Sequence, residues 1–332
     1  MSRDRWVARM TALAAVRRGR HGARLCDPLR KGNKSAMPKP WKYLATAALT
    51  LGASAMPAHA AKAPATPPPA AGYTMPSTQV WDMKADSGEV YRIFVSYPAA
   101  NVEVPAGGFP VLYVLDGNAL FASFAETRRI QEFADVGKSI VVGVGYPTDD
   151  AYDVRRLYDL TGGPPPPPWD VEFAKERNGG WDKFLDFLTG KLRTEIAARY
   201  KTNPQRQALF GHSLGGLFAI HTLFTRPDAF HAIVAASPSL FWHHQEMLKE
   251  ERAFTAALQA GTITNPARLM VVAGERDETA LEFWDPQDFA KRMEPLSVYG
   301  LRSRSRTYPE EGHITVPSRS VTETLRFAFT WP

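Results

Sequence analysis

Cysteine is almost absent from this sequence, which has a single one, Cys26, among 332 residues. One thiol cannot form an internal disulfide framework or a cysteine-based metal site. Cys26 also lies in a basic N-terminal stretch, and if that stretch is removed the remaining chain has no thiol at all. A cysteine nucleophile is then excluded. His243 and His244 with Glu246 are too generic a group to indicate a metal site.

The body of the chain also lacks the positive charge that the whole sequence suggests. The formal net charge is +6, but residues 1–60 hold twelve Lys and Arg against two acidic residues. The rest of the chain has 28 basic and 32 acidic residues. Because a nucleic-acid surface needs clustered positive charge, we expect no nucleic-acid partner.

Long hydrophobic runs are missing as well. The apolar stretch from about residue 44 to 56 contains Gly52 and is short for a membrane span, so we expect no stable span. It follows two lysines and precedes Ala58-His59-Ala60, which is the order of a secretory signal peptide. An uncleaved anchor or a disordered leader is the alternative. We expect a periplasmic or secreted protein.

These features predict how the chain is divided. Residues 1–36 form a non-native or disordered extension, with Met37 as the true start, and residues 37–60 form the signal peptide. Residues 61–74 are a linker rich in proline and alanine. Residues 75–332 then form one domain, large enough to bury a sizeable core.

Apolar runs and helical patterns alternate along this domain, which indicates an α/β fold with a mostly parallel central sheet covered by helices on both faces. The strand-like runs are 89–97, 110–115, 139–144, a run ending at Ser213, 231–236, 268–273 and 302–308. The helical patterns are 122–136, 181–200, 214–225, 245–259 and 286–296. Residues 160–170 contain Pro164 to Pro168, which predicts a stiff loop that either rims the active site or is a surface insertion.

The most informative motif is Gly211-His212-Ser213-Leu214-Gly215-Gly216, a G-x-S-x-G pattern between a predicted strand and a predicted helix. In that context a serine occupies a sharp turn that exposes its hydroxyl above the sheet. The pattern predicts Ser213 as a nucleophile and an α/β-hydrolase fold. A chance match in a glycine-rich turn is the competing interpretation.

A serine nucleophile needs a base, and the α/β-hydrolase order is serine, acid, histidine. His313 is the histidine that lies beyond the last predicted strand, so we expect it to be the base. The acid should follow the strand that ends at Gly274. Asp277 is our choice, with Glu275 and Glu278 as competitors.

The oxyanion of the tetrahedral intermediate needs backbone N–H donors. One should be the N–H of Leu214, the residue after the nucleophile. The other should come from the loop after residues 111–115. There we favour the N–H of Asn118 and, next to it, that of Gly117, although Asp-Gly-Asn is also ordinary turn chemistry.

Several blocks in this order resemble the siderophore esterases of the α/β-hydrolase group. They are VLYVLDGNA at 111–119, GVGYP at 143–147, NPQRQ at 203–207, the serine motif, and SPSLFW at 237–242. The resemblance covers most of residues 75–332. It implies Ser213 as nucleophile, His313 as base and a trilactone siderophore of the enterobactin or salmochelin type as substrate. Some periplasmic members use a serine and histidine with no clear acid, which leaves Asp277 open.

Substrate contacts are less clear from the sequence. Arg128 and Arg129 could face an anionic ligand or simply form a solvated helix face. Phe241 and Trp242 could form an aromatic wall for catechol rings or belong to the core.

We therefore expect a serine esterase that cleaves a small-molecule ester, free or iron-bound, through an acyl-enzyme and without a cofactor. A general or feruloyl-type carboxylesterase, or an acyltransferase, is one alternative. The other is a non-catalytic periplasmic binding protein with the same fold.

Overall fold

The computed structural model describes residues 72–167, 173, 175–277 and 285–330. The chain divides into two units, Met1–Tyr73 and Thr74–Pro332, and the second contains nearly all of the described residues. The expected extension 1–36, signal peptide 37–60 and most of the linker 61–74 lie outside the described residues, as does Cys26.

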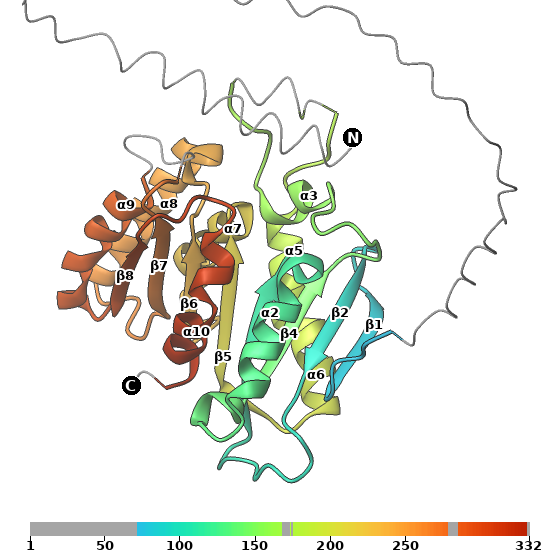
Figure 1. The fold of residues 1–332 in the computed structure, drawn as a ribbon. Helices are drawn as coiled ribbons and strands as arrows, with labels where there is room; N and C mark the ends of the chain where they lie inside the picture. The colour runs from blue at the N-terminus through green and yellow to red at the C-terminus, as the bar shows by residue number, and fades with distance from the viewer. Residues whose placement is uncertain (1–71, 168–172, 174, 278–284, 331–332) are drawn as a thin grey trace, which may run out of the picture. The chain divides into compact units, whose positions relative to one another are not determined.

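An eight-stranded sheet in the order β1-β2-β4-β3-β5-β6-β7-β8 runs through the second unit (Figure 1). The first two strands, β1 (Thr78–Lys84) and β2 (Val90–Ser96), form an antiparallel pair, and β2 is also antiparallel to β4 (Ile140–Gly145). The other strands are parallel to β4: β3 (Phe109–Leu115), β5 (Thr202–His212), β6 (Ala232–Ala236), β7 (Arg268–Gly274) and β8 (Ser303–Tyr308).

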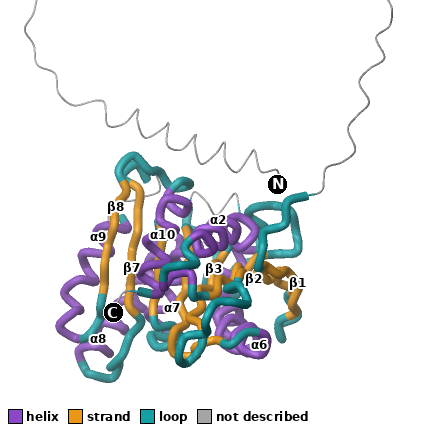
Figure 2. The backbone as a smooth tube through the Cα atoms, turned by 60° about the horizontal axis from the view of Figure 1, so that its bottom comes forward, coloured by secondary structure: helices purple, strands orange, loops and turns teal. Residues whose placement is uncertain are grey.

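Helices cover both faces of the sheet, and this explains the continuous apolar runs. In Figures 1 and 2, α2 (Gly117–Ile130) and α10 (Val316–Phe329) lie on one face, while α6 (Arg193–Arg199), α7 (Leu214–Thr225) and α8 (His244–Gln259) lie on the other. Every residue of β3, β4, β6 and β7 is buried. The other α-helices in the described part of the chain are α3 (Arg156–Leu160), α5 (Trp181–Phe187) and α9 (Pro286–Met293).

The core between the sheet and the α2/α10 layer consists of apolar side chains from both. Phe124 of α2 and Phe210 of β5 are fully buried, with ring centroids 4.8 Å apart. Leu325 of α10 belongs to the same cluster. Burying such side chains contributes about 1.5–3 kcal/mol each, so this contact fixes α2 and α10 against the strands that carry the site.

Most of the predicted elements are present, and the differences have physical reasons. Helix α7 has the predicted bounds, whereas α2 begins at Gly117 rather than at residue 122 because the Asp116 carbonyl accepts the N–H groups of Ala119 and Leu120. The predicted helix 181–200 contains a wider turn, Leu188–Leu192. Strand β1 and helix α10 were not predicted. Residues 164–167 form neither helix nor strand, as expected, while Pro168 lies outside the described residues.

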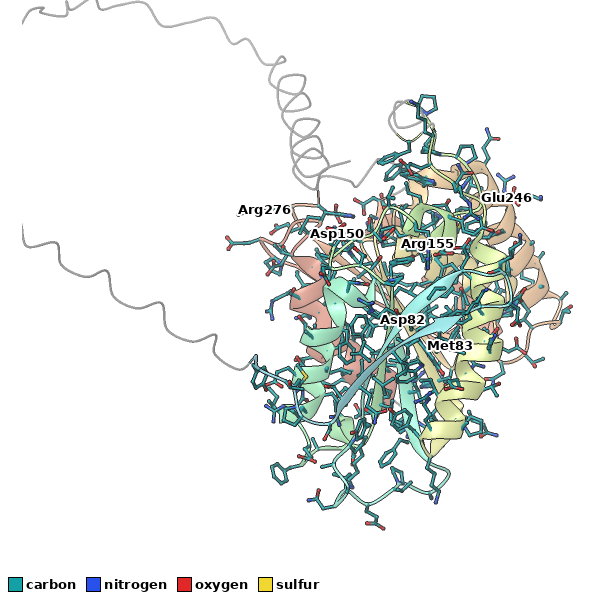
Figure 3. All side chains as sticks on the ribbon, turned by 90° about the vertical axis from the view of Figure 1, so that its right-hand side faces the viewer. Asp82, Met83, Asp150, Arg155, Glu246 and Arg276 are labelled. Carbon is teal, nitrogen blue, oxygen red and sulfur yellow. The ribbon has the colours of Figure 1, made fainter. Side chains whose placement is uncertain are left out.

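The parallel strands end at one edge of the sheet, so the loops that follow them gather there. Figure 3 shows labelled residues from this region at the upper end of the molecule, beyond Asp82 and Met83 of β1; they are Asp150, Arg155, Glu246 and Arg276. We call this the carboxyl edge. Ser213, at the end of β5, lies on it.

Candidate active site

Ser213 occupies a strained backbone position between β5 and α7. Its φ of 59° and ψ of −117° lie in a region that non-glycine residues rarely adopt, at a cost of about 1–3 kcal/mol. Close backbone packing requires the glycines around it. A Cβ on Gly211 would collide with the carbonyl of Gly215, and one on Gly216 would lie 2.9 Å from the Cα of Pro238. The motif thus forms the predicted sharp turn.

The turn is held by the loop that follows β6. The Ser213 N–H donates to the carbonyl of Ala236 at 3.0 Å, and the Ser213 carbonyl accepts the N–H of Ser239 at 3.1 Å. The hydroxyl oxygens of Ser213 and Ser239 are 3.2 Å apart, so a second hydroxyl contacts the predicted nucleophile. Ser239 was not predicted as a site residue, although it lies in the block SPSLFW.

His313 comes from the loop between β8 and α10. Its Nδ1 lies 3.1 Å and 3.3 Å from the two carboxylate oxygens of Asp277, which follows β7. Both side chains are 2% exposed. A carboxylate on Nδ1 orients the imidazole so that Nε2 is its other functional nitrogen. The structure therefore brings together the histidine and the acid that the sequence favoured.

The competing acids do not share this position. The carboxylate of Glu275 accepts the backbone N–H of Glu310 at 3.1 Å, and Glu278 lies outside the described residues.

His212 connects the strand of Ser213 to the loop of His313. Its Nε2 lies 2.8 Å from the main-chain oxygen of His313, and the two ring centroids are 4.7 Å apart. Burial, followed by the proximity of His313, lowers the pKa of His212 well below its usual value. The ring is therefore neutral at physiological pH.

The predicted oxyanion donors lie at the N-termini of two helices. Leu214 is the first residue of α7, and Gly117 and Asn118 are the first two of α2. The first N–H groups of a helix have no intrahelical partner and favour negative charge. The strands that precede these helices, β3 and β5, are neighbours in the sheet. Leu214, Asn118 and Gly117 thus remain predicted donors, now at adjacent strand ends.

A buried ion pair fixes the turn between β3 and α2. Asp116, with φ 53° and ψ 48°, accepts two hydrogen bonds of 2.8 Å and 2.9 Å from the guanidinium of Arg156, at the start of α3. The side chain of Asn118 bonds the backbone of Tyr146 and Thr148 after β4. Both side chains therefore hold the start of α2. Neither role was predicted, and nothing in the sequence pairs Arg156 with Asp116.

The prediction that Arg128 faces a ligand is wrong. The residue is 2% exposed, and its guanidinium donates to the hydroxyl of Ser96 and to the carbonyls of Tyr97 and Gly137. It ties α2 to β2 and to the turn before β4. Arg129 forms a two-pronged ion pair with Glu126 on the same helix. Its role toward a ligand stays a prediction.

The predicted aromatic wall lies in the short 3₁₀ helix Leu240–His243, just after β6. Trp242 is buried, 5.8 Å between centroids from Phe173, whereas Phe241 is partly exposed. Trp242 thus packs largely in the interior, and Phe241 is the better placed of the two to meet a ligand.

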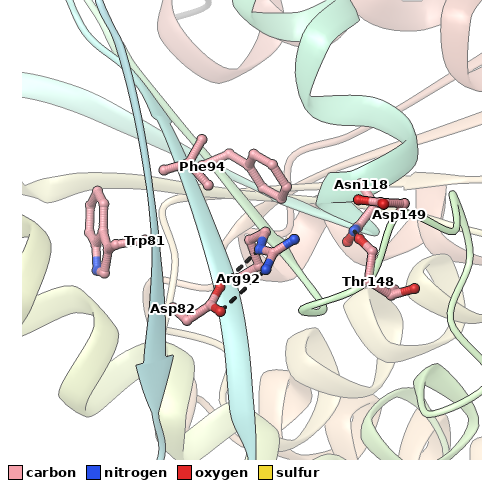
Figure 4. A pocket seen from close by; sticks show the side chains of 8 residues that line it. Trp81, Asp82, Arg92, Phe94, Asn118, Thr148 and Asp149 are labelled. Atoms are coloured by element: carbon pink, nitrogen blue, oxygen red, sulfur yellow. Dashed lines mark hydrogen bonds and ion pairs between the residues drawn. The ribbon is translucent and has the colours of Figure 1, made fainter.

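A pocket of about 550 Å³ opens beside Asn118 (Figure 4). Phe94 and the ion-paired Arg92 and Asp82 line it on the β1–β2 side, and Thr148 and Asp149 line it after β4. Arg92 pairs with Gly145 at the end of β4, so the pocket lies at the carboxyl edge. Its volume is within the range of small-molecule sites.

Within residues 72–167, 173, 175–277 and 285–330, no group of three or more His, Cys, Asp or Glu side chains could hold a metal ion. None of the helices described is both long and apolar enough to cross a membrane.

The chain is similar in sequence to known esterases. The family model "Esterase", described as putative esterase, matches residues 87–313. The ferri-bacillibactin esterase BesA of Bacillus subtilis is 33% identical, over 77% of this chain and 91% of its own. The siderophore triacetylfusarinine C esterase of Aspergillus fumigatus is 37% identical, over 61% and 70%. The crystal structure of the BES protein from Bacillus cereus superposes with a TM-score of 0.69 at 28% identity, covering 80% of this chain and all of that one.

Proposed function

Because the chain belongs to the esterase family and is a carboxylic ester hydrolase with the α/β-hydrolase fold, we propose that it hydrolyses the backbone esters of a siderophore. The curated relatives described above are esterases of ferri-bacillibactin and of triacetylfusarinine C, which supports this substrate class. A catecholate trilactone of the enterobactin type is the specific substrate that we propose, on the sequence blocks described above.

The observation that carries the proposal is the convergence of three loops at the carboxyl edge. Ser213 follows β5 in a strained turn, Asp277 follows β7, and His313 follows β8 with its Nδ1 on Asp277. Their order in the chain is the order of the α/β-hydrolase triad. We assign Ser213 as nucleophile, His313 as general base and Asp277 as the acid that orients it.

In the first half of the reaction, the Ser213 hydroxyl attacks the ester carbonyl while His313 Nε2 takes its proton. Asp277 stabilises the resulting imidazolium through Nδ1. The N–H groups of Leu214 and of Asn118 or Gly117 receive the developing oxyanion, because the first N–H groups of a helix have no intrahelical partner. His313 then returns the proton to the leaving alcohol, and an acyl-enzyme remains on Ser213.

In the second half, a water molecule takes the place of the alcohol. His313 removes its proton, the water attacks the acyl carbon, and the Ser213 oxygen leaves with that proton. The charges and protons balance within these residues. For a cyclic trilactone, one cycle opens the ring and further cycles release the monomers.

We propose that the enzyme works outside the cytoplasm. The support is the charged, apolar and small-residue order of residues 37–60, which fits a signal peptide. Mass analysis of the protein from an exporting host tests this: a mature N-terminus at Ala61 is expected, and an intact leader on the exported protein would contradict it.

Product analysis tests the function. The purified protein is incubated with iron-free and ferric trilactone siderophores, with a feruloyl ester and with a p-nitrophenyl acyl ester, and the products are separated by chromatography and mass spectrometry. We expect linear trimers, dimers and monomers at rates well above those on the other esters. Negligible turnover of every trilactone, with good turnover of the simple esters, would overturn the substrate class and leave the esterase activity.

A further inference from the structure

His212 is the x residue of the serine motif, where sequence patterns treat any residue as equivalent. In the structure it is the last residue of β5, 2% exposed, and its Nε2 lies 2.8 Å from the carbonyl oxygen of His313. A carbonyl only accepts hydrogen bonds, so Nε2 carries the proton and donates. A side chain adjacent to the nucleophile thus binds the main chain of the base.

His212 has to stay neutral to play this part. Its ring lies 4.7 Å from that of His313, which becomes positively charged when it takes the serine proton. A second positive charge there would oppose that step. Burial, followed by the neighbouring His313 and Arg156, lowers the pKa of His212 well below its usual value, and the hydrogen bond to the His313 carbonyl and the charge of Asp277 only partly oppose this. The neutral ring therefore donates without adding charge.

The two restraints on His313 act on different parts of the residue. Asp277 holds the imidazole through Nδ1, and His212 holds the main chain of the loop between β8 and α10. Ser213 is itself fixed, because its N–H donates to Ala236. Since His212 and Ser213 share a peptide bond, a rigid link runs from the nucleophile to the backbone of the base.

We infer that His212 is a positioning residue, which sets the distance and angle between His313 and Ser213 through its hydrogen bond to the His313 carbonyl. The inference rests on the proposed roles of Ser213 and His313 but not on a siderophore substrate. A displacement of about 1 Å at a reacting group can reduce turnover about 100-fold, so one such bond can matter.

The chain offers a matched control. His231, just before β6, also has Nε2 2.8 Å from a carbonyl, that of Ala328, but it lies at the opposite edge of the sheet. The Nδ1 of His231 also lies 2.8 Å from the carbonyl oxygen of Gln207, so His231→Leu removes two such contacts and costs stability without touching the triad. A comparison of His212→Leu with His231→Leu therefore separates positioning from folding.

A second pair of variants separates the bond from the side-chain volume. The amide nitrogen of glutamine can reach the position of a histidine Nε2, whereas that of asparagine stops near Nδ1. We expect His212→Gln to keep the hydrogen bond and His212→Asn to lose it at similar polarity. This pair is informative even if His212→Leu does not fold.

The experiment measures kcat and KM on a p-nitrophenyl ester, the labelling rate of Ser213 by a fluorophosphonate, and the thermal midpoint. We expect His212→Leu and His212→Asn to lose about 10- to 100-fold in kcat and in labelling rate with KM within about twofold. His212→Gln should retain at least about a third of wild-type kcat, since it remakes the bond. His231→Leu should lower the midpoint and leave kcat unchanged.

Three results would overturn the inference: wild-type kcat in His212→Asn, equal loss in His212→Gln and His212→Asn, or equal loss in His231→Leu. Because the assay uses a simple ester, failure of the siderophore assignment leaves this test intact. Ester hydrolysis that survives Ser213→Ala would instead remove the triad on which both proposals depend.

Discussion

The two edges of the parallel sheet both carry polar side chains bonded to backbone carbonyls, yet their backbones differ. At the carboxyl edge, the strained residues with positive φ include Asp116, Ser213 and Ser237, which directly follow β3, β5 and β6. At the opposite, amino edge, His231, Arg268 and Arg206 bond the carbonyls of residues 327–329.

The difference shows what each set of bonds does. The last carbonyls of α10 lack helical partners, and cations near a helix C-terminus are favourable, so the amino-edge contacts complete a helix end. The carboxyl-edge contacts hold residues in backbone conformations that residues other than glycine usually avoid. Strain of this kind persists only where the surroundings over-determine it, and it is typical of functional sites. Mutations at the carboxyl edge should therefore reduce catalysis, whereas mutations at the amino edge should reduce stability alone.

The largest effect is expected for Ser213→Ala. Without the hydroxyl no acyl-enzyme forms, so kcat should fall at least about 10⁴-fold on any ester, with a thermal midpoint close to that of the wild type. Steady-state kinetics and calorimetry measure the two quantities. A companion variant, Ser213→Gly, should be equally inactive. It should be more stable than Ser213→Ala by about 1 kcal/mol, because glycine adopts this conformation without strain. Equal or lower stability of the glycine variant would contradict the strain at this edge.

A smaller loss is expected for Asp277→Asn. An amide at this position can bind the wrong tautomer of His313 and does not stabilise its imidazolium, so kcat should fall about 10²- to 10⁴-fold. The matched control is Glu275→Gln, a neighbouring carboxylate whose hydrogen bond goes to the backbone of Glu310. Steady-state kinetics on one ester should show a loss of kcat in Asp277→Asn and none in Glu275→Gln. An unchanged kcat in Asp277→Asn would indicate a serine and histidine pair that works without this acid.

The buried carboxyl group of Asp159 in α3 should make the stability of the protein depend on pH. It is fully buried, accepts a hydrogen bond from Tyr91 at 2.8 Å, and burial raises its pKa from 3.8 to about 6. The folded protein thus binds this proton more tightly than the unfolded chain. The resulting stabilisation is complete below about pH 3.8 and is lost as the pH rises through about 6.

The variant Asp159→Asn removes this buried charge and should therefore stabilise the folded protein most at neutral pH. The free energy of unfolding of the variant relative to wild type should rise by about 2–3 kcal/mol between pH 4 and pH 7. Urea unfolding at both pH values measures this change. A difference that does not vary with pH would mean that Asp159 titrates alike in the folded and unfolded chains.

The smallest effect is expected at the amino edge. Arg206 donates to the carbonyl of Phe329 and is partly exposed, so Arg206→Met should lower stability by about 1 kcal/mol. Its kcat and KM should equal those of the wild type. A loss of activity comparable to that of the carboxyl-edge variants would show that the two edges do not differ in function.

Some of this molecule could be predicted because the signals are local. The glycine-flanked serine between a strand and a helix indicated the elbow, and the continuous apolar runs indicated buried parallel strands. Strand β1 was missed because it is a polar edge strand with little burial. Helix α10 was missed because Val316–Phe329 contains Pro317, two valines, two threonines and two serines, which are poor helix formers.

Other features depend on long-range contacts. The environment of Arg128 was predicted wrongly, because a charged residue on a helix is ordinarily solvated and only the packing of α2 against β2 gives this one buried acceptors. Asp277 was favoured over Glu275 from the sequence, but both follow β7 closely, and only the path of the loop decides which carboxylate reaches His313. His212 lies within the motif itself, yet its partner is 101 residues away.

The sequence by itself thus determined the fold class, the position of Ser213 and the order of the residues that surround it, since periodicity and glycine placement act over a few residues. Only the tertiary structure decided which acid meets His313, that Arg128 is buried, and that His212 and Ser239 belong to the site. These outcomes follow from burial and hydrogen bonding between distant segments. Such interactions depend on how the strands are ordered in the sheet, which no local pattern specifies.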